Sequence, residues 1–326
     1  MRFIVAVHST VLGPSLGGLR LKRYPGGLTE ALADVMGLAR TMTLKAAAAG
    51  LALGGGKAVL IDDGAGDRRE ERLVGAAGVI DELGGAYVTA EDIGTTTADM
   101  DLMSLHTPYV VGRSVERGGG GDPSPVTAET VFRAVLCGLR AAEGSDDLDG
   151  RRVGVIGLGK VGNALAVRLA EGGAEVIACD LDAARAERFA AQHGGVVAPS
   201  AEAVLATDLD VLAPCAAGGM IDDALARSLS CSVVAGAANN PLTSRDVAAV
   251  LARRGILYAP DFLANCGGLI HVAREWYGDA GPDEAELVDR AEESLERAIA
   301  TAAAEDSTPV AVAERQALER VAAARA

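Results

Sequence analysis

Residues 157–162 read G-L-G-K-V-G, a glycine spacing that can bring backbone N–H groups against a phosphate. This hexapeptide follows the apolar run 153–156 and opens a helical pattern over 163–172. In such a turn the glycines permit tight turning and close approach of a pyrophosphate, while the helix N-terminus attracts negative charge. The residues concerned are Gly157, Leu158, Gly159, Lys160, Val161 and Gly162. A tight strand-to-helix turn without a ligand can show the same pattern, and the Lys160 side chain could equally reach a phosphate or lie in solvent.

An acidic residue strengthens the interpretation of this loop. Asp180 ends the second apolar run, 174–180, and lies 23 residues after Gly157. At this place a carboxylate can accept a hydrogen bond from a ribose 2′-hydroxyl, and it repels a 2′-phosphate. The loop and Asp180 together predict a dinucleotide site that takes NAD rather than NADP.

Two lysines and an aspartate provide a second set of candidates. Lys45 and Lys57 flank the small-residue run AAAAGLALGGG, and Asp92 comes directly after a strand-like segment. A lysine in an apolar setting is costly to desolvate and can have a lowered pKa, so it can act as a base or as an electrostatic stabiliser. Without further information each lysine could also be a solvated helix cap, and Asp92 a solvated loop residue.

The elements that must position these residues fall into two groups. The first contains a strand at 2–7, a Gly- and Pro-rich loop over 9–20, a helix over 28–42, a glycine loop before a strand near 58–62, a helix at 69–84 and a strand at 86–90. After the Gly/Pro-rich linker 117–125, short apolar runs alternate with helical patterns. Such alternation predicts a parallel, doubly wound sheet of the Rossmann type.

We therefore expect an α/β protein of two domains, with an N-terminal α/β domain at 1–125 and a dinucleotide-binding Rossmann domain at 126–289. The Ala-, Glu- and Arg-rich helical region at about 290–326 is expected to pack back on the first domain or on a partner subunit.

Composition excludes several classes of partner. The formal net charge is −15, which opposes binding to nucleic acid or to an anionic membrane. Five scattered cysteines without a CxxC pair indicate a reducing compartment, and the N-terminus does not resemble a secretion signal, so we expect a cytoplasmic protein. The four histidines lack partners at ligand spacing, and no metal site is expected.

The longer motifs resemble a known family. In chain order they are LGPSLGGLR, MTLKAAAAGLALGGGK, TAEDIGTTTADMD, APCAAGG, AGAANN and LYAPDFLANCGG. They closely resemble the leucine, valine and phenylalanine dehydrogenases, which are related to glutamate dehydrogenases, and the resemblance runs from about residue 3 to residue 320. It implies a homo-oligomeric enzyme that uses NAD to convert an L-amino acid to its 2-oxo acid and ammonia, reversibly, with the first domain binding substrate and mediating oligomerisation.

The resemblance also implies roles for the residues of the first domain. Lys45 would hold the substrate carboxylate beside the backbone of Gly17 and Gly18. Lys57 would activate the attacking water, and Asp92 would carry protons to and from the substrate nitrogen. Lys57 must then exist in its neutral form near working pH, whereas Lys45 stays charged.

Residues of the cofactor side are implied in the same way. Asn240 would touch both substrate and nicotinamide, and Ala238 and Asn239 would contact the cofactor. Thr127 and Arg20 match further positions near the nicotinamide. Asn265 is either structural or lines the site.

The side chain of the substrate is less well determined by the sequence. Polar anchors for a glutamate carboxylate are not evident, which favours an apolar substrate. Ala90 matches a position that lines the substrate pocket in the family, and its small side chain favours leucine or valine as substrate. Three other segments more closely resemble the phenylalanine-acting members: GRSVERGGGG, LSCSVVAGAANN and IHVAREW. A glutamate-type dehydrogenase and a non-catalytic NAD-binding protein are the alternatives; the intact site residues argue against the latter. Family members commonly carry a helix before the first strand, so the size of the oligomer is not implied.

Overall fold

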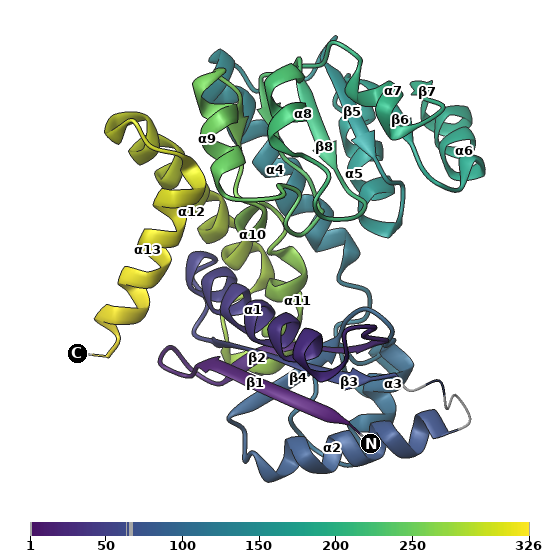
Figure 1. The fold of residues 1–326 in the computed structure, drawn as a ribbon, viewed down its shortest axis with the longest axis vertical. Helices are drawn as coiled ribbons and strands as arrows, with labels where there is room; N and C mark the ends of the chain where they lie inside the picture. The colour runs from purple at the N-terminus through teal and green to yellow at the C-terminus, as the bar shows by residue number, and fades with distance from the viewer. Residues whose placement is uncertain (1, 63, 65–67, 326) are drawn as a thin grey trace. The chain divides into compact units, whose positions relative to one another are not determined.

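The computed structural model describes residues 2–62, 64 and 68–325, which form two compact units (Figure 1). The first unit contains residues 1–123, 269–287 and 317–326, and the second contains residues 124–268 and 288–316. Both are α/β units, so the predicted two-domain α/β fold is confirmed. Among the described residues, no helix has the length and apolar character needed to cross a membrane.

The sheet of the first unit has four strands in the order β1-β3-β2-β4. They are β1 (Phe3–Ser9), β2 (Ser15–Lys22), β3 (Gly54–Ile61) and β4 (Tyr87–Glu91). Strand β1 is antiparallel to β3, whereas β2 runs parallel to both β3 and β4. The carboxyl ends of β2, β3 and β4 therefore meet at one edge of the sheet.

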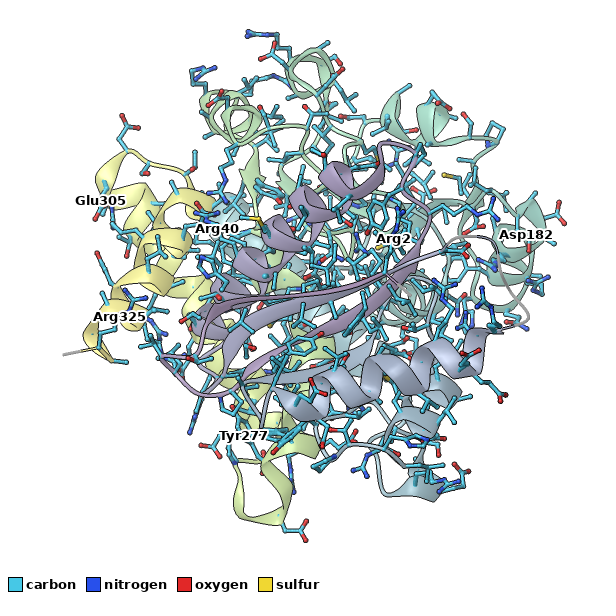
Figure 2. The ribbon with its side chains drawn as sticks, turned by 60° about the horizontal axis from the view of Figure 1, so that its bottom comes forward. Arg2, Arg40, Asp182, Tyr277, Glu305 and Arg325 are labelled. Carbon is cyan, nitrogen blue, oxygen red and sulfur yellow. The ribbon has the colours of Figure 1, made fainter. Side chains whose placement is uncertain are left out.

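Helices cover both faces of this sheet. The helices of the first unit's N-terminal part are α1 (Gly27–Ala48), α2 (Arg69–Glu82) and α3 (Thr97–Met103), followed by the short η2 (Val115–Arg117). Figures 1 and 2 show α1 and α2 on opposite faces. Side chains alternate along β3 accordingly: Val59 packs with Val35 of α1, while Ala58 and Leu60 pack with the core of α2 and α3.

The second unit contains a six-stranded, wholly parallel sheet in the order β10-β9-β8-β5-β6-β7. Its strands are β5 (Arg152–Ile156), β6 (Glu175–Cys179), β7 (Val196–Val197), β8 (Val211–Pro214), β9 (Val233–Val234) and β10 (Leu257–Tyr258). Its helices include α4 (Ser124–Glu143), α5 (Lys160–Glu171), α6 (Ala183–His193), α7 (Ala201–Leu205), α8 (Asp223–Ser228), α9 (Asp246–Arg253) and α10 (Asp261–Ala264). This strand order is that of a doubly wound dinucleotide-binding fold, as the sequence predicted.

The C-terminal helices divide between the units differently from the expectation. They are α11 (Gly267–Tyr277), η3 (Gly278–Ala280), α12 (Glu284–Glu305) and α13 (Pro309–Ala323). Residues 269–287 belong to the first unit rather than to the Rossmann domain. Of the C-terminal region expected to pack back, residues 317–326 do belong to the first unit, whereas 288–316 belong to the second.

Polar contacts explain this division. In the first unit, Glu275 of α11 accepts hydrogen bonds from the N–H of Gly112 and from Arg113, and the Tyr277 hydroxyl, labelled in Figure 2, accepts from the N–H of Ala52. Arg320 donates to the carbonyl oxygens of Ala47 and Gly50. In the second unit, the α12 residues Glu292 and Glu296 pair with Arg133 and Arg140 of α4.

Two segments predicted as loops are strands, and in both cases glycine was misinterpreted. Residues 15–22 form the central strand β2, and Gly54 to Gly56 begin β3. A Cβ on Gly17 would lie 1.8 Å from the carbonyl oxygen of Gly56, and a Cβ on Gly55 would lie 2.0 Å from the backbone nitrogen of Thr43 in α1. These glycines serve close packing between neighbouring backbones rather than chain reversal.

Candidate active site

Three charged side chains meet on the face of the first unit's sheet that α1 covers. Lys57 lies on β3, Arg20 on β2, and Asp92 directly follows β4. The Nζ of Lys57 is 3.1 Å from Oδ2 of Asp92, and the Nε of Arg20 donates to the same oxygen at 2.8 Å. Lys57 is only 5% exposed, so this ammonium group is withdrawn from water.

The electrostatics of this cluster favour a lysine that can lose its proton. Burial is the largest influence on Lys57 and lowers its pKa. The positive charge of Arg20 lowers that pKa as well, whereas the Asp92 carboxylate raises it and so offsets part of the effect. Burial alone would raise the pKa of Asp92, but Lys57 and Arg20 together hold it below its ordinary value. The cluster therefore combines a firmly ionised carboxylate with a lysine whose neutral form is more accessible than that of a lysine in water.

The two oxygens of Asp92 are not equivalent. Arg20 and Lys57 both contact Oδ2, and no described residue hydrogen-bonds Oδ1. The backbone N–H of Asp92 donates to the Thr95 hydroxyl, which itself donates to the carbonyl oxygen of Leu19 on β2. Asp92 is thus fixed through its backbone and Oδ2, and Oδ1 remains available to exchange a proton.

Glycine backbone lies directly against this carboxylate. A Cβ on Gly18 would be 2.7 Å from the Cβ of Asp92 and 2.6 Å from the carbonyl oxygen of Glu91. The buried Tyr87 hydroxyl donates to the carbonyl oxygen of Gly17 at 2.5 Å. Any side chain at residue 18 would displace Asp92, whereas glycine leaves the backbone accessible beside it. Lys45 lies in the last turn of α1 and is half-buried.

The glycine loop of the second unit has the predicted local geometry. Gly159 caps α5, Gly157 has a φ of 100°, and a Cβ on Gly162 would lie 2.0 Å from the carbonyl oxygen of Gly157. Nothing lies within 4 Å of a Cβ on Gly159, so the N-terminus of the 12-residue helix is open there. An open helix N-terminus that follows a parallel strand fits the pyrophosphate of a dinucleotide.

Asp180 follows β6 beside this loop. Its Oδ2 accepts from the N–H of Leu158 at 2.7 Å, its Oδ1 accepts from the N–H of Asp182 at 2.9 Å, and Arg185 is 3.8 Å away. Because an ionised carboxylate has about four acceptor positions, these bonds orient Asp180 and leave capacity for a ribose hydroxyl.

Residues 238–240 form a turn after β9. Asn240 has a φ of 49°, a left-handed conformation, and its N–H donates to Oδ2 of Asp261 at 2.8 Å. The Nδ2 of Asn265 donates to Oδ1 of Asn239 at 2.9 Å and to the carbonyl oxygen of Ala237 at 3.1 Å. Of the two interpretations of Asn265, these contacts favour a structural role that supports the turn. Asn239 and Asn240 are exposed, Ala238 is buried, and Thr127 lies in the first turns of α4.

Sequence reasoning missed two residues of the charge cluster. Nη1 of Arg20 is 3.0 Å from Oδ2 of Asp34 on α1, and the Tyr24 hydroxyl donates to the same oxygen at 2.6 Å. Arg20 was expected near the nicotinamide; the structure places its guanidinium against Asp92 and Asp34, and the cofactor contact stays a prediction. Asp34 lies at helical spacing from the apolar residues that α1 buries, and this spacing was the signal in the sequence that could have identified it.

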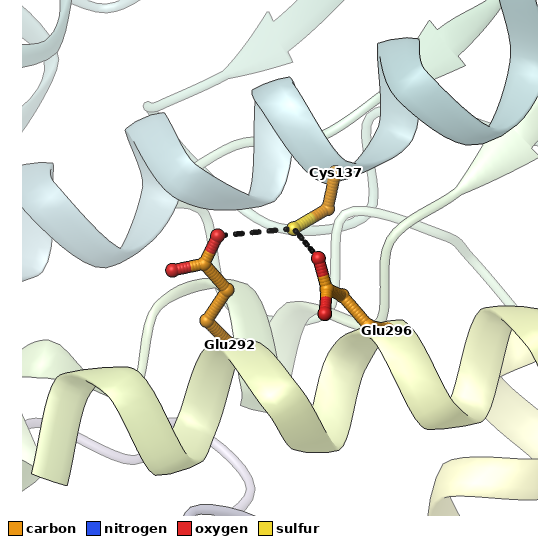
Figure 3. Close-up of side chains that lie close together, drawn as sticks. All are labelled: Cys137, Glu292 and Glu296. Carbon is orange, nitrogen blue, oxygen red and sulfur yellow. Dashed lines mark hydrogen bonds between the residues drawn. The ribbon is translucent and has the colours of Figure 1, made fainter. Parts of the chain in front are cut away.

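One group of side chains elsewhere has metal-ligand character. Cys137 on α4 faces Glu292 and Glu296 on α12, with Sγ 3.7 Å and 3.9 Å from their carboxylate oxygens (Figure 3). Both carboxylates are already paired with arginines. Burial has the largest effect on the Cys137 thiol and the two glutamates add to it, so that its pKa is raised to about 12. A protonated thiol between neutralised carboxylates is a contact between helices, and we assign no metal to it. A neighbouring groove of about 520 Å³ is lined mainly by Ala, Ile and Leu.

Comparison with known proteins identifies the family. Residues 1–109 match the dimerisation domain of Glu/Leu/Phe/Val dehydrogenases, and residues 182–326 match the Glutamate/Leucine/Phenylalanine/Valine dehydrogenase domain. The chain belongs to this family of amino-acid dehydrogenases. The glycine loop lies between the two matched segments, so the assignment of the loop depends on its own geometry.

Individual relatives of the dehydrogenase cover nearly the whole chain. The leucine dehydrogenase of Geobacillus stearothermophilus is 40% identical over 98% of this chain and 87% of its own length. The valine dehydrogenase of Streptomyces virginiae is 45% identical over 85% and 78%. The crystal structure of L-tryptophan dehydrogenase from Nostoc punctiforme has a TM-score of 0.86 and 33% identity over 99% of this chain and 92% of that one.

Replacement of Asp92 by Asn tests the charge cluster through stability. Asp92 has a lowered pKa in the folded state, so its stabilisation is complete above the ordinary value of 3.8 and is lost as the pH falls through the folded value. We expect Asp92→Asn to lower the free energy of unfolding by roughly 2 kcal/mol at pH 7. That difference should shrink below about pH 4.

The measurement is urea unfolding followed by the fluorescence of Trp276, the single tryptophan, which lies in the same unit. Glu71→Gln, an exchange at an exposed carboxylate of α2, is the control and should change little. A stability difference for Asp92→Asn that is the same at pH 7 and pH 3 would contradict the assignment.

Proposed function

We propose that the enzyme oxidatively deaminates an L-amino acid of the leucine or valine class to its 2-oxo acid and ammonia, reversibly and with NAD as the oxidant. The observation that carries the proposal is the buried Lys57 bonded to Asp92 beside the Gly18 backbone. A lysine with a lowered pKa and an ionised carboxylate with one free oxygen supply the base and the proton carrier that deamination requires.

Small apolar residues support the branched-chain assignment. Ala90 and Val272 are both buried, and both approach the space that a Cβ on Gly112 would take, at 3.9 Å and 3.7 Å. Leucine and valine dehydrogenases are also among the relatives with at least 40% identity. The phenylalanine class is the alternative, because one methylene changes the discrimination of an apolar site between substrates by only ~1–3 kcal/mol.

The residues of the first unit can perform the proton transfers. We propose that Lys45 pairs with the substrate carboxylate, with the backbone of Gly17 and Gly18 beside it. Neutral Lys57 takes a proton from the water that attacks the Cα of the oxidised substrate. Oδ1 of Asp92 takes a proton from the substrate ammonium before the hydride is lost and returns it to the nitrogen of the hydrated intermediate. The ionised carboxylate then accepts the proton of the hydroxyl group as the C=O bond forms and ammonia leaves. Arg20, bonded to Oδ2, keeps the carboxylate ionised between turnovers.

The second unit is proposed to hold the cofactor, which when bound accepts the hydride of the substrate Cα. The pyrophosphate would rest on residues 157–162, and Asp180 would accept from the ribose 2′-hydroxyl. The Asp180 carboxylate favours NAD, since it is held in place by the Leu158 N–H and would repel a 2′-phosphate. Ala238, Asn239, Asn240 and Thr127 are the further contacts proposed, Asn240 also to substrate.

We also propose a cytoplasmic homo-oligomer. All five cysteines are free thiols, as expected of a reducing compartment. On α1, Leu28, Leu32 and Met36 recur every four residues and are 51%, 40% and 63% exposed. This apolar stripe lies within the segment that matches a dimerisation domain, and a second copy of the chain would remove it from water.

A substrate panel tests the proposed activity. With NAD, kcat/KM for L-leucine or L-valine should exceed that for L-phenylalanine by about tenfold or more and that for L-glutamate by a larger factor. NADP should support less than about a tenth of the NAD rate. The absorbance of the reduced cofactor is the readout, and D-leucine is the control. A higher kcat/KM for L-glutamate than for any apolar amino acid would refute the proposal.

Lys57→Ala tests the proposed base. Turnover should fall by ~10³-fold or more, because general-base catalysis contributes roughly 10²–10⁴-fold and the Asp92 carboxylate also loses one of its two partners. NADH binding, measured by fluorescence, should stay within about threefold. Lys22→Ala, at an exposed lysine on β2, is the control and should keep full turnover. Turnover of Lys57→Ala within about tenfold of the native rate would exclude Lys57 as the base.

Light scattering tests the oligomer. The native protein should have at least twice the mass of one chain, and the double exchange Leu32→Glu with Met36→Glu should reduce that mass because charges would be buried in the contact. Leu105→Glu, at a leucine that is 59% exposed and lies outside α1, is the matched control. An unchanged mass in the α1 variant would show that the stripe is not the contact.

A further inference from the structure

We propose that Asp34 is a positioning residue of this active site: it anchors the Arg20 guanidinium so that Arg20 contacts only Oδ2 of Asp92 and leaves Oδ1 free. The consequence for turnover rests on the proposed function. The positioning itself does not, because it follows from contacts within the first unit.

The contacts form a continuous chain from α1 to β3. The Tyr24 hydroxyl donates to Oδ2 of Asp34 at 2.6 Å, and Nη1 of Arg20 donates to both oxygens of Asp34, at 3.0 Å and 3.2 Å. Nε of Arg20 then donates to Asp92 at 2.8 Å, and Lys57 completes the chain at 3.1 Å. Only 13% of the Arg20 side chain is exposed, so its guanidinium is committed to these two carboxylates.

The geometry of arginine explains why an anchor is needed. A guanidinium beside a carboxylate tends to form two parallel hydrogen bonds, one to each oxygen. If Arg20 bound Asp92 in that way, it would occupy Oδ1, the oxygen that has no partner among the described residues. The two bonds from Nη1 to Asp34 fix the orientation of the guanidinium. In that orientation Nε donates to Oδ2 of Asp92, whereas Nη2 donates to neither oxygen of that carboxylate. Asp34 thereby keeps one oxygen of Asp92 available for proton exchange.

The charge of Asp34 has a second effect, on Lys57. The ionisable groups that face Lys57 are Asp92 after β4, Arg20 on β2 and Asp34 on α1. Two tyrosines also border the cluster, but burial raises the pKa of each, Tyr24 also through Asp34, so both hydroxyls are neutral. When Lys57 is protonated, the positive charges of Lys57 and Arg20 are balanced by the negative charges of Asp92 and Asp34. Loss of the Asp34 charge leaves Lys57 and Arg20 with one carboxylate, which favours neutral Lys57.

The sign of the pH effect follows. Burial is the largest influence that lowers the pKa of Lys57, and Asp34 works against it. Without the Asp34 charge the pKa of Lys57 falls further, so the neutral base forms at lower pH. The rise of kcat/KM with pH should then move to lower pH.

The composition of the chain allows a direct measurement of Lys57. The chain contains only four lysines: Lys22, Lys45, Lys57 and Lys160. In the full-length protein with isotope-labelled lysine side chains, NMR can follow the titration of each, and the Lys57 signal is assigned by its loss in Lys57→Arg. We expect the Lys57 midpoint to fall by about 0.5–1 pH unit in Asp34→Asn. In Glu71→Gln, which removes an equal charge elsewhere in the same unit, the change should be under about 0.2 unit.

Kinetics with two variants separates the position of Arg20 from the charge of Asp34. Asn keeps an oxygen that can accept from Arg20, whereas Ala does not. We expect the kcat of Asp34→Asn at its optimum to stay within about threefold of native and that of Asp34→Ala to fall about tenfold or more, with equal NADH binding. Both variants should show the acid limb of kcat/KM at lower pH.

The inference is overturned if the Lys57 titration is unchanged in Asp34→Asn, or if the Asn and Ala variants reach the same kcat. The NMR result requires no turnover. If the native protein oxidised no amino acid, the proposed function would fall while the titration would still decide whether Asp34 acts on Lys57.

Discussion

The Asp92 carboxylate, held between a buried lysine and an arginine, is the group on which the charge balance of the first unit's cluster depends. A lone Lys57 ammonium in that position would be costly, because the side chain is almost fully removed from water. Asp92 makes its burial tolerable, and Arg20 in turn limits how strongly Asp92 holds the lysine proton. Asp34 and Tyr24 complete the balance from α1. The site is therefore a set of opposed charges in which the protonation of Lys57 depends on Asp92, Arg20 and Asp34.

Such a cluster can form only because the backbones around it approach closely. Gly17 rests against the carbonyl oxygen of Gly56, and Gly18 rests against Asp92 itself. Parallel pairing of β2 with β3 and β4 then brings Arg20, Lys57 and Asp92 side by side on the face of the sheet that α1 covers. The glycines have a double consequence, because they allow the strands and α1 to pack and leave bare backbone beside the carboxylate, where the amino-acid substrate is proposed to bind.

In the second unit, the candidate cofactor site is formed mainly by local chain geometry rather than by contacts between distant segments. Its loop, from Gly157 to Gly162, is a single strand-to-helix turn, and Asp180 is fixed beside it by the N–H of Leu158. The Asn239–Asn240 turn is supported by Asn265 and Asp261 through side-chain contacts to its own chain. Within this unit, the proposed cofactor contacts are mainly backbone groups that a few polar side chains keep in place.

The sequence by itself determined the family, the two-domain α/β class and the glycine loop, because these depend on motifs whose residues are adjacent or follow the period of one element. It also supplied Lys57 and Asp92 as candidates. From the sequence, β2 and the start of β3 were predicted as loops, because glycine is common both in turns and in strands whose backbones pack closely. Only the tertiary structure showed that Lys57 and Arg20 contact the same oxygen of Asp92 and that Asp34 holds the arginine. It alone also showed that residues 269–287 belong to the first unit. Those facts depend on strand register and on contacts between distant segments, which no local pattern records.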